Sequence, residues 1–487
     1  GMESIPSESE CYPAKLAHGH AQWLIDHGVK TIFHPCVFYE HQEVPGAQNH
    51  FNCPIVVSYP ENIKNNVEAV TDGSVRYLHP FLAFTNEKVA SDRLVQFCKE
   101  VWNIPEKETR HAAHLAWEEQ RRAKADVRAT GAKALADMEK NGGSGIVLAG
   151  RPYHVDPEIN HGIPELIAAY GLTVLTEDCL PINFTPKRPV RVNDQWVYHS
   201  RLYTAAEFVC GRDDLELIQL NSFGCGLDAV TTDEVCELLE QGGKLYTCLK
   251  IDEVNNLGAV RIRIRSLLAA VAMRRERGIH STSHVQPFER VYYTKEMQKQ
   301  HYTILAPQMS PIHFDILEPI FRHHGYNFEV LQNDDRAAID AGLKYVNNDA
   351  CYPSITAVGQ LMEAVTSGRY DTDHLALIMS QTGGCCRASN YIAFIRRALK
   401  KAGLEHIPVI SLNANGMETN EGFRISPSLL LDAAHGIVLG DLLMRCLYRV
   451  RPYELEKGSA NALHRKWRDI CIDSLTSAHP QYLSLIH

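Results

Sequence analysis

Short apolar runs alternate with longer amphipathic stretches along most of the chain, and glycine, proline or asparagine separates them. The apolar run Gly145–Gly150 has the length and composition of a buried strand. The polar stretch 107–140 is long enough for a helix and ends at Asn141-Gly142-Gly143, a sequence typical of helix ends. Strands that alternate with helices favour parallel sheets. The pattern predicts an α/β protein with several flavodoxin- or Rossmann-like parallel-sheet domains.

Further helices and strands are expected from the same pattern. Thr231, with Glu234 three positions later, has the sequence of a capping box and predicts a helix start. The other predicted helices cover Ala21–His27, Ile163–Tyr170, Ile262–Arg277, a stretch from Ser310, Asn390–Lys401 and most of residues 426–487. The other predicted strands are Val29–Phe33, Val56–Tyr59, Leu172–Leu175, Leu215–Leu220, Lys244–Lys250, Tyr302–Ala306, Asn327–Leu331, Leu375–Ser380 and Ile407–Leu412.

The breaks in this pattern predict three α/β segments and a helical tail. The segments are 1–140, 141–298 and 299–425, and the tail is 426–487. A polar linker is expected over 278–298, at the end of the second segment. The chain opens directly on Gly1-Met2-Glu3, so we expect the first segment to lack its opening strand. We interpret the sequence as a piece of a longer polypeptide.

The charge balance and the apolar runs exclude two classes of partner. Lys and Arg total 49 against 58 Asp and Glu, a net charge of −9, so there is no basic excess to bind nucleic acid. No run reaches the roughly 18 apolar residues that a membrane helix requires. The polar, acidic start is not a secretory signal. We therefore expect a cytoplasmic protein that binds neither nucleic acid nor membranes.

The chain has 14 cysteines, which secreted disulfides, buried thiols or metal ligation could explain. The missing signal argues against disulfides. Dispersed single cysteines on loops favour an iron–sulfur cluster over zinc, because no Cys-x-x-Cys pair occurs. Buried thiols remain the alternative for each cysteine, and four inside apolar patterns are expected in the core: Cys98, Cys236, Cys248 and Cys446. The candidates on loops beside proline or glycine are Cys11, Cys36, Cys53, Cys225, Cys351 and Cys386.

One short motif occurs twice. Cys11–Pro13 and Cys351–Pro353 both read Cys-Tyr-Pro, and a glycine follows eight residues after each cysteine, at Gly19 and Gly359. Each copy precedes a predicted helix, a predicted strand and another cysteine-bearing loop. The matching order suggests two pseudo-equivalent halves.

Three polar residues after the strand Gly145–Gly150 are candidates for catalysis. A guanidinium suits an anionic substrate, so Arg151 is a candidate substrate contact. Imidazoles transfer protons near neutral pH, so His154 and His161 are candidate proton carriers. The alternative is that the three residues cap the following helix and contact solvent.

Five motifs in order are similar to a known family. They are Glu8–Lys15, Asn52–Val56, Asn221–Asp228, Asp349–Pro353 and Thr382–Tyr391. Over nearly all of residues 1–450 the chain resembles the large activase-related proteins of the 2-hydroxyacyl-CoA dehydratase and benzoyl-CoA reductase superfamily. In that family an ATPase activator segment often precedes a cluster-binding region, and this chain resembles the latter.

The resemblance implies a low-potential iron–sulfur cluster, either [4Fe–4S] or double-cubane, and an electron-transfer role in anaerobic metabolism. Carried over by motif, the ligands are the six loop cysteines named above. Cys385 stands where the family is expected to have glycine, and we favour Cys386 because it aligns with the Cys-Arg-Ala-Ser-Asn run. Arg387, beside it, either neutralises a charged cluster or pairs with an acid.

The implied partners are an ATP-dependent activator, fused or separate, an acyl-CoA or small-molecule substrate, and a second copy in a homodimer. The chain shows no phosphate-binding signature of its own, so ATP hydrolysis is expected elsewhere. Two other functions stay open. One is a dehydratase subunit with a single [4Fe–4S] cluster that acts on a CoA thioester. The other is a non-catalytic regulatory scaffold with structural thiols or zinc.

Overall fold

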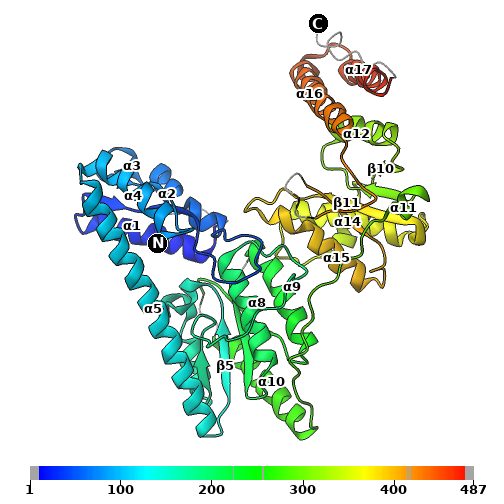
Figure 1. Cartoon of the computed structure of the whole chain (residues 1–487). Coiled ribbons are helices and arrows are strands. Elements are labelled where there is room, and N and C mark those ends of the chain that lie inside the picture. The colour runs from blue at the N-terminus through cyan, green and yellow to red at the C-terminus, as the bar shows by residue number, and fades with distance from the viewer. Residues whose placement is uncertain (1–9, 223, 255–256, 414–415, 417, 478–487) are drawn as a thin grey trace. The chain divides into compact units, whose positions relative to one another are not determined.

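A computed structural model describes residues 10–222, 224–254, 257–413, 416 and 418–477 (Figure 1). The chain divides into two compact units. The first is Gly1–Phe288 together with Cys385–Arg387, and the second is Glu289–Gly384 together with Ala388–His487. The division after Phe288 falls within the expected linker. The finer four-part division stays a prediction, and the expected missing first strand concerns residues outside the described ones.

The start of the first unit holds two small parallel sheets. Strand β1 pairs with β3 and β2 pairs with β4, and helices α1 and α2 supply the buried residues Ala21 and Ile63. The elements are α1 Tyr12–Asp26, β1 Thr31–Phe33, β2 Cys36–Tyr39, α2 Pro54–Asn66, α3 Glu68–Thr71, β3 Arg76–Leu78, β4 Phe81–Ala83, α4 Glu87–Trp102 and α5 Glu106–Lys140.

The predicted strand Val56–Tyr59 is wrong, because these residues lie inside helix α2. Pro54 is the first residue of that helix, and its ring fixes the backbone φ angle that a helix start needs. A run of four apolar residues has no periodicity that separates a strand from a helix, so the proline was the decisive signal.

The centre of the first unit is a four-stranded parallel sheet of order β6-β5-β7-β8. This is the strand order of a flavodoxin-like sheet, whose ligand crevice lies between the ends of its first and third strands, here β5 and β7. The elements are β5 Gly145–Ala149, α6 Pro157–Asn160, α7 Ile163–Ala168, β6 Thr173–Leu175, α8 Val197–Cys210, β7 Leu215–Ser222, α9 Gly226–Gln241, β8 Thr247–Ile251 and α10 Leu257–Glu276, with a short 3-10 helix η2 at Pro152–Val155.

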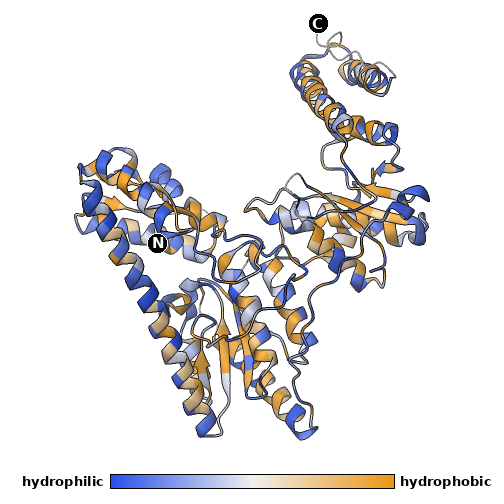
Figure 2. Cartoon of the chain, in the orientation of Figure 1, coloured by the Kyte–Doolittle hydropathy of each residue, from blue (hydrophilic) through white to orange (hydrophobic). Residues whose placement is uncertain are grey.

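Apolar residues on these strands form the core of the sheet. Ile146 on β5 and Ile218 on β7 are almost fully buried, and they pack with Ile264 of α10. Figure 2 shows the strands as mostly hydrophobic, while long stretches of α5 are hydrophilic. Helix α5 approaches the segment after β6 closely at Gly131, where an added Cβ would lie 2.0 Å from the carbonyl oxygen of Cys179.

The predicted helix start at Thr231 is also wrong. Helix α9 begins at Gly226, and the Thr231 hydroxyl donates to the Leu227 carbonyl inside the helix, 3.2 Å away. Helical threonines can make this internal hydrogen bond, so the capping-box pattern was coincidental.

The second unit contains a parallel sheet with the same strand order, β10-β9-β11-β12. Its core includes Ile304, Ile378 and Ile410 from three of the strands. The elements are α11 Lys295–Lys299, β9 Thr303–Ala306, α12 Pro311–His323, β10 Phe328–Val330, α13 Arg336–Tyr345, α14 Tyr352–Thr366, η3 Thr372–His374, β11 Leu375–Ser380, η4 Arg387–Asn390, α15 Tyr391–Lys401, β12 Val409–Leu412, α16 Pro427–Val450, η5 Arg451–Tyr453 and α17 Ser459–Thr476.

The α/β fold class with several parallel sheets is confirmed, since all strand pairs in the described sheets are parallel. The expected helices of the tail are present as α16 and α17, with residues 478–487 outside the described part. Among the described residues, no helix combines the length and apolar character needed to span a bilayer.

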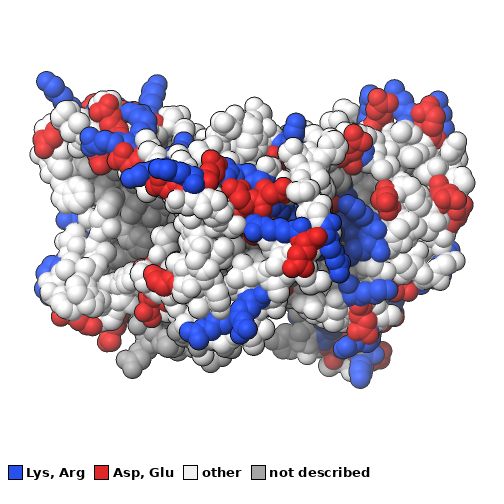
Figure 3. All heavy atoms as spheres, turned by 90° about the horizontal axis from the view of Figure 1, so that it is seen from below, with Lys and Arg blue, Asp and Glu red and all other residues white. Residues whose placement is uncertain are grey.

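The arginines of α10 lie on a largely exposed helix. Several of them donate to backbone carbonyls of their own unit, as Arg263 does to Cys248 at 3.1 Å. Figure 3 shows basic and acidic side chains interspersed over one face of the molecule. These contacts favour the solvated-face interpretation of the basic run.

Candidate functional site

Four of the six candidate cysteines begin helices. Cys11, Cys53, Cys225 and Cys351 are the N-cap residues of α1, α2, α9 and α14, each with an extended backbone. A helix N-terminus presents unpaired N–H groups and the positive end of the helix dipole, so it stabilises a thiolate. None of the four side chains completes a capping hydrogen bond. The sequence placed these cysteines on loops, and the structure adds that the loops lead into helices.

Three of these thiols, all in the first unit, are coupled electrostatically. Negative charge on Cys53 raises the pKa of both Cys11 and Cys225. Burial is the larger cause in each case, and the pKa of Cys225 rises to about 12. Tyr59 of α2 lies beside Cys11 and opposes the rise there, as does the positive charge of Arg151. The three N-caps therefore form one group of thiols in the first unit.

The segment Cys385–Arg387 adds two more thiols, Cys385 and Cys386, to this group. It belongs to the first unit, although the chain on either side belongs to the second. Burial, then the charges of Cys386 and Cys53, raise the pKa of Cys385. Cys386 is exposed, whereas Cys385 is half-buried. The choice of Cys386 as a ligand stays a prediction, and Cys53 acts on its neighbour Cys385.

Two side chains hold this cysteine segment by its backbone. Trp196 Nε1 donates to the carbonyl of Cys385 at 3.0 Å, and Gln195 Nε2 donates to the carbonyl of Cys386 at 3.2 Å. The Trp196 side chain is only 1% exposed, so its hydrogen bond is shielded from water. The guanidinium of Arg387 lies against Gly226, the first residue of α9, since a Cβ there would be 2.8 Å from it.

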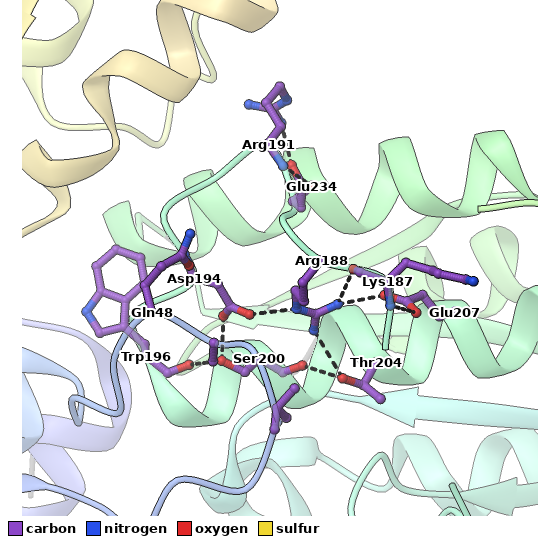
Figure 4. Close-up of polar contacts among 12 residues, drawn as sticks. Gln48, Lys187, Arg188, Arg191, Asp194, Trp196, Ser200, Thr204, Glu207 and Glu234 are labelled. Atoms are coloured by element: carbon purple, nitrogen blue, oxygen red, sulfur yellow. Dashed lines mark hydrogen bonds and ion pairs between the residues drawn. The ribbon is translucent and has the colours of Figure 1, made fainter. Parts of the chain in front are cut away.

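A buried network of ion pairs fixes the loop that carries Trp196 (Figure 4). Arg188 pairs with Asp194 at 3.0 Å and with Glu207 of α8 at 2.7 Å. Arg191 pairs with Glu234 of α9 at 2.9 Å. Removing one partner of a buried pair leaves an uncompensated charge, so such networks hold one backbone conformation strongly. The loop, and through it the cysteine segment, is thus tied to α8 and α9.

Arg151 lies at the centre of the group, directly after β5. Its side chain is 3% exposed, its Nη2 donates to Asp228 of α9, and the same atom is 3.8 Å from Cys225 Sγ. Asp228 is the third residue of α9, so this ion pair joins the loop after β5 to the helix after β7. The site therefore lies where the strand order predicts a ligand crevice.

Two buried histidines lie near Arg151. The N–H of Arg151 donates to His154 Nδ1 at 2.9 Å, so a neutral His154 carries its proton on Nε2. Burial, then the charge of Arg151, lowers the pKa of His154 to about 3 and that of His199 well below its usual range. Both imidazoles are therefore neutral at physiological pH.

Several buried polar atoms around Arg151 have no hydrogen-bond partner within the described residues. They are Arg151 Nε, His154 Nε2, both ring nitrogens of His199, and Asp228 Oδ2. An unpaired buried polar group costs about 1–3 kcal/mol, so such atoms gather where a protein accommodates something polar.

The remaining predicted residues have other neighbours. His161 ends helix α6, and its Nε2 lies 2.7 Å from the carbonyl of Asp252. Cys36 is 2% exposed at the start of β2, where Glu61 and Lys64 are the charges that act on it. Cys351, in the second unit, lies 3.0 Å from the hydroxyl of Tyr391.

The expectation of core thiols is wrong for Cys446, which is exposed on α16. Cys98, Cys236 and Cys248 are half-buried rather than in the core. The fully buried thiols elsewhere are Cys179, Cys210 and Cys471. Apolar neighbours in sequence did not predict burial, because the helices of Cys98, Cys236 and Cys446 also have a solvent face, and Cys248 lies on the edge strand β8.

The residue types of the group suit an anionic metal–sulfur cluster. Thiols at helix N-termini, the two guanidiniums of Arg151 and Arg387, and an unpaired Arg151 Nε–H all favour negative charge. Within the described part of the chain, no three His, Cys, Asp or Glu side chains have the geometry of a metal site. The donor chemistry therefore fits, and the sulfur atoms do not adopt a coordination geometry.

Residues 1–180 match the model of the CoA enzyme activase uncharacterised domain. The match includes Cys11, Cys36, Cys53, Arg151 and His154, and it relates this part of the chain to CoA enzyme activases. It supports the activase-related family that the sequence motifs indicated. A comparison with curated proteins finds no match.

Sequence reasoning missed Gln195, Trp196 and His199. Asp228 was inside a quoted motif but had no assigned role. The segment before α8 has no repeat or motif, and its function depends on contacts with residues about 190 positions away, at Cys385 and Cys386. A tryptophan in a polar segment was the one signal that could have been followed.

Proposed function

We propose that this chain is the iron–sulfur component of an ATP-coupled, low-potential electron-transfer system that serves a CoA-dependent enzyme. The observation that carries the proposal is the group of thiols that includes Cys11, Cys53, Cys225 and Cys385, with Arg151 Nη2 3.8 Å from Cys225 Sγ. The match of residues 1–180 to an activase domain supports the CoA-related part.

The chain's own residues would hold the cluster and set its charge. Cys11, Cys53, Cys225 and one of the pair Cys385 and Cys386 would be ligands, and Cys36 and Cys351 complete the six-ligand set. When bound, the cluster would supply a low-potential one-electron reductant for an acyl-CoA or small-molecule substrate. An ATP-dependent activator, fused or separate, would reduce it again. Because burial raises the pKa of Cys11 and Cys225, loading the cluster releases protons that these thiols hold at neutral pH.

Arg151 is better suited to positioning than to binding a charged substrate. Asp228 already neutralises its guanidinium, and both side chains are buried. We propose that this pair fixes the Cys225 loop against β5. His154, neutral with its proton on Nε2, offers a hydrogen bond to a sulfur or a substrate.

A specific observation favours the single [4Fe–4S] cluster as the second candidate. With one of the pair Cys385 and Cys386 as a ligand, Cys11, Cys53 and Cys225 bring the first unit to four ligands, and a cubane of this kind takes four cysteines. A dehydratase-like subunit that acts on a CoA thioester would then be the function.

The deciding measurement is iron, acid-labile sulfide and zinc per chain after strictly anaerobic purification. About eight irons would support a double-cubane cluster with six ligands, and about four would support the single cluster. Zinc, or no metal with all thiols free, would overturn the proposal in favour of a structural scaffold.

Single variants then identify the ligands. Cys225→Ser is expected to lose most of the iron, while Cys446→Ser, an exposed thiol on α16, serves as the matched control and keeps it. Comparing Cys385→Ser with Cys386→Ser decides which of the pair ligates. Unchanged iron in Cys225→Ser would remove that residue from the ligand set.

A further inference from the structure

One cavity in the first unit is separate from the thiols. It has a volume of about 550 Å³ and lies between helices α5 and α8 and the segments around Val44 and Leu180. Sites for small molecules have volumes of about 300–1,000 Å³. Its wall includes Pro152 after β5 and Glu177 after β6, so it lies at the carboxyl ends of two parallel strands.

Glu177 is the buried titratable group of this cavity. It is 7% exposed, and its Oε2 accepts the N–H of Gly150 at 3.2 Å. Burial, then the neighbouring Asp178, raises the pKa of Glu177 to about 7, although Arg201 and the N–H of Gly150 oppose the rise. A carboxyl group of this kind is half protonated at neutral pH, and such groups concentrate at binding sites.

A cluster of two cations and one carboxylate forms another part of the wall. Glu43 accepts from Lys124 at 2.6 Å and from Arg201 at 2.5 and 2.9 Å. Burial opposes the ionisation of Glu43, but Arg201 and then Lys124 outweigh it and lower its pKa to about 2. The cluster therefore keeps a net positive charge at all physiological pH values.

Arg128 of α5 adds a further cation. It lines the cavity, its side chain is exposed, and it has no ion pair within the described residues. Against Lys124, Arg201 and Arg128 stand Glu43 and Asp178. The walls carry one net positive charge when Glu177 is protonated and none when it is ionised.

The rest of the lining is apolar. Val44, Val127, Leu180, Ile182 and Phe184 line the cavity, and the Phe184 side chain is 38% exposed. An exposed aromatic ring beside an unpaired arginine suits a ligand with an apolar body and a negative group.

We propose that this cavity binds a small organic acid, with its carboxylate on Arg128 and its apolar body against Val44, Leu180 and Ile182. Protonated Glu177 donates a hydrogen bond to the same ligand. The proposal is independent of the cluster, because none of the candidate cysteines lines the cavity in the described residues. Pro152 lies next to Arg151 in sequence, so the cavity wall and the thiol group share one segment of chain.

The charged and titratable side chains that line the cavity with Glu177 set the expected pH dependence. They are Glu43, Lys124, Arg128, Asp178, Tyr198 and Arg201. The pKa of Glu43 is too low for titration between pH 6 and 8, and burial and Glu40 raise that of Tyr198 to above this range. No histidine is among the lining residues that the structure describes. Glu177 is therefore the group that titrates there.

Three probes with the same six-carbon chain test the proposal: hexanoate, hexylamine and hexanamide, each titrated into the purified full chain by calorimetry. Hexanoate is expected to bind saturably, and to bind about tenfold more weakly at pH 8 than at pH 6, because Glu177 loses its proton. Hexylamine binding more tightly than hexanoate, or no saturable binding by any probe, would overturn the proposal.

Two variants locate the contacts. Arg128→Gln is expected to weaken hexanoate binding at least fivefold, whereas Arg122→Gln, an exposed arginine on the same helix outside the cavity, leaves it unchanged. Glu177→Gln keeps a hydrogen-bond donor and is expected to remove the pH dependence. Equal binding by Arg128→Gln and the unmodified chain would overturn the proposed carboxylate contact. These measurements need no iron, so their outcome is separate from that of the cluster assay.

Discussion

The two four-stranded sheets have the same strand order but differ in the residues that follow their first and third strands. In the first unit these positions hold Arg151 and the helix that carries Asp228, a buried ion pair surrounded by unpaired polar atoms. In the second unit they hold Gln308 and Gln381, which are neutral. Gln381 donates to the Ser389 carbonyl at 2.9 Å and accepts from Ser411 at 2.7 Å.

This difference indicates which of the two crevices is suited to binding a ligand. A neutral amide whose nitrogen and oxygen are both hydrogen-bonded stabilises a crevice without placing a charge in it. A buried charge with incomplete hydrogen bonds costs stability, and proteins keep such groups where they bind or react. The shared fold therefore does not determine where the functional residues lie. The loops after the strands determine it.

The largest expected effect comes from breaking the ion pair of the first unit. Asp228→Asn leaves Arg151 buried and charged without its carboxylate, which is expected to cost about 3–5 kcal/mol. Hydrogen exchange of peptides from β5 and α9 would measure the loss, while peptides from β9 and β11 serve as the internal control.

Replacing both partners sharpens that test. Arg151→Met combined with Asp228→Leu removes the charge together with its partner, so the double variant is expected to regain at least half of the lost stability. A stable Asp228→Asn protein, with unchanged exchange in both units, would contradict the contrast between the two crevices.

The second effect is the pH dependence contributed by one carboxyl group in each unit, with opposite signs. Glu177 has a folded-state pKa of about 7, above its ordinary value of 4.5, so its folded form holds more protons. The contribution of Glu177 to the stability of the first unit is expected to fall by about 3 kcal/mol as pH rises from 4.5 through 7. Glu177→Gln should flatten this fall, measured by exchange of peptides from β5 and β6.

In the second unit, Glu418 provides the counterpart. Burial opposes its ionisation, but Arg396 and then Arg290 outweigh it and lower its pKa. Its contribution is present above the unfolded pKa and is lost as pH falls. If Glu177→Gln left the pH dependence of the first unit unchanged between pH 4.5 and 7, the assignment of Glu177 would be wrong.

A smaller effect is expected in the neutral crevice. Gln381→Leu leaves the Ser389 carbonyl and the Ser411 hydroxyl without this partner, at a cost of about 1–3 kcal/mol. The loss should appear in exchange of β11 and β12 peptides. Gln300→Leu, near the surface after α11, is the control and is expected to change stability by less than about 0.5 kcal/mol.

The smallest effect comes from the hydrogen bond that holds the cysteine segment. Trp196→Phe keeps the aromatic ring but removes the donor to the Cys385 carbonyl, at a cost of about 1 kcal/mol. Alkylation of Cys385 is expected to accelerate relative to that of Cys446, as measured by mass spectrometry of the metal-free protein. Trp102→Phe on α4, a partly exposed tryptophan, should leave this ratio unchanged.

The sequence predicted the regular parts of the fold because their signals are local. Gly145–Gly150 and Leu375–Ser380 are apolar runs bounded by breaks, and both are strands in the structure. The two errors, at Val56–Tyr59 and Thr231, both lie near the start of a helix. The start of α2 at Pro54 and that of α9 at Gly226 depend on only one or two residues.

The site was partly predictable for the same reason. Cysteine beside proline or glycine marked the N-caps Cys11, Cys53 and Cys225, since proline and glycine are also residues of helix starts. Nothing local marked Trp196, because its contact with Cys385 is made across 189 positions of chain. Glu177 was missed because its unusual pKa comes from burial, which a single acidic residue after a strand does not signal.

The N-cap cysteines have a consequence for the energetics of the fold. Serine, threonine, asparagine or aspartate at these positions would accept a backbone N–H and stabilise the first turn by about 1 kcal/mol each. Thiols leave those turns incomplete at α1, α2 and α9. A cluster that binds these three cysteines as thiolates would also complete the first turns of three helices. Cluster binding and the stability of the fold are therefore linked.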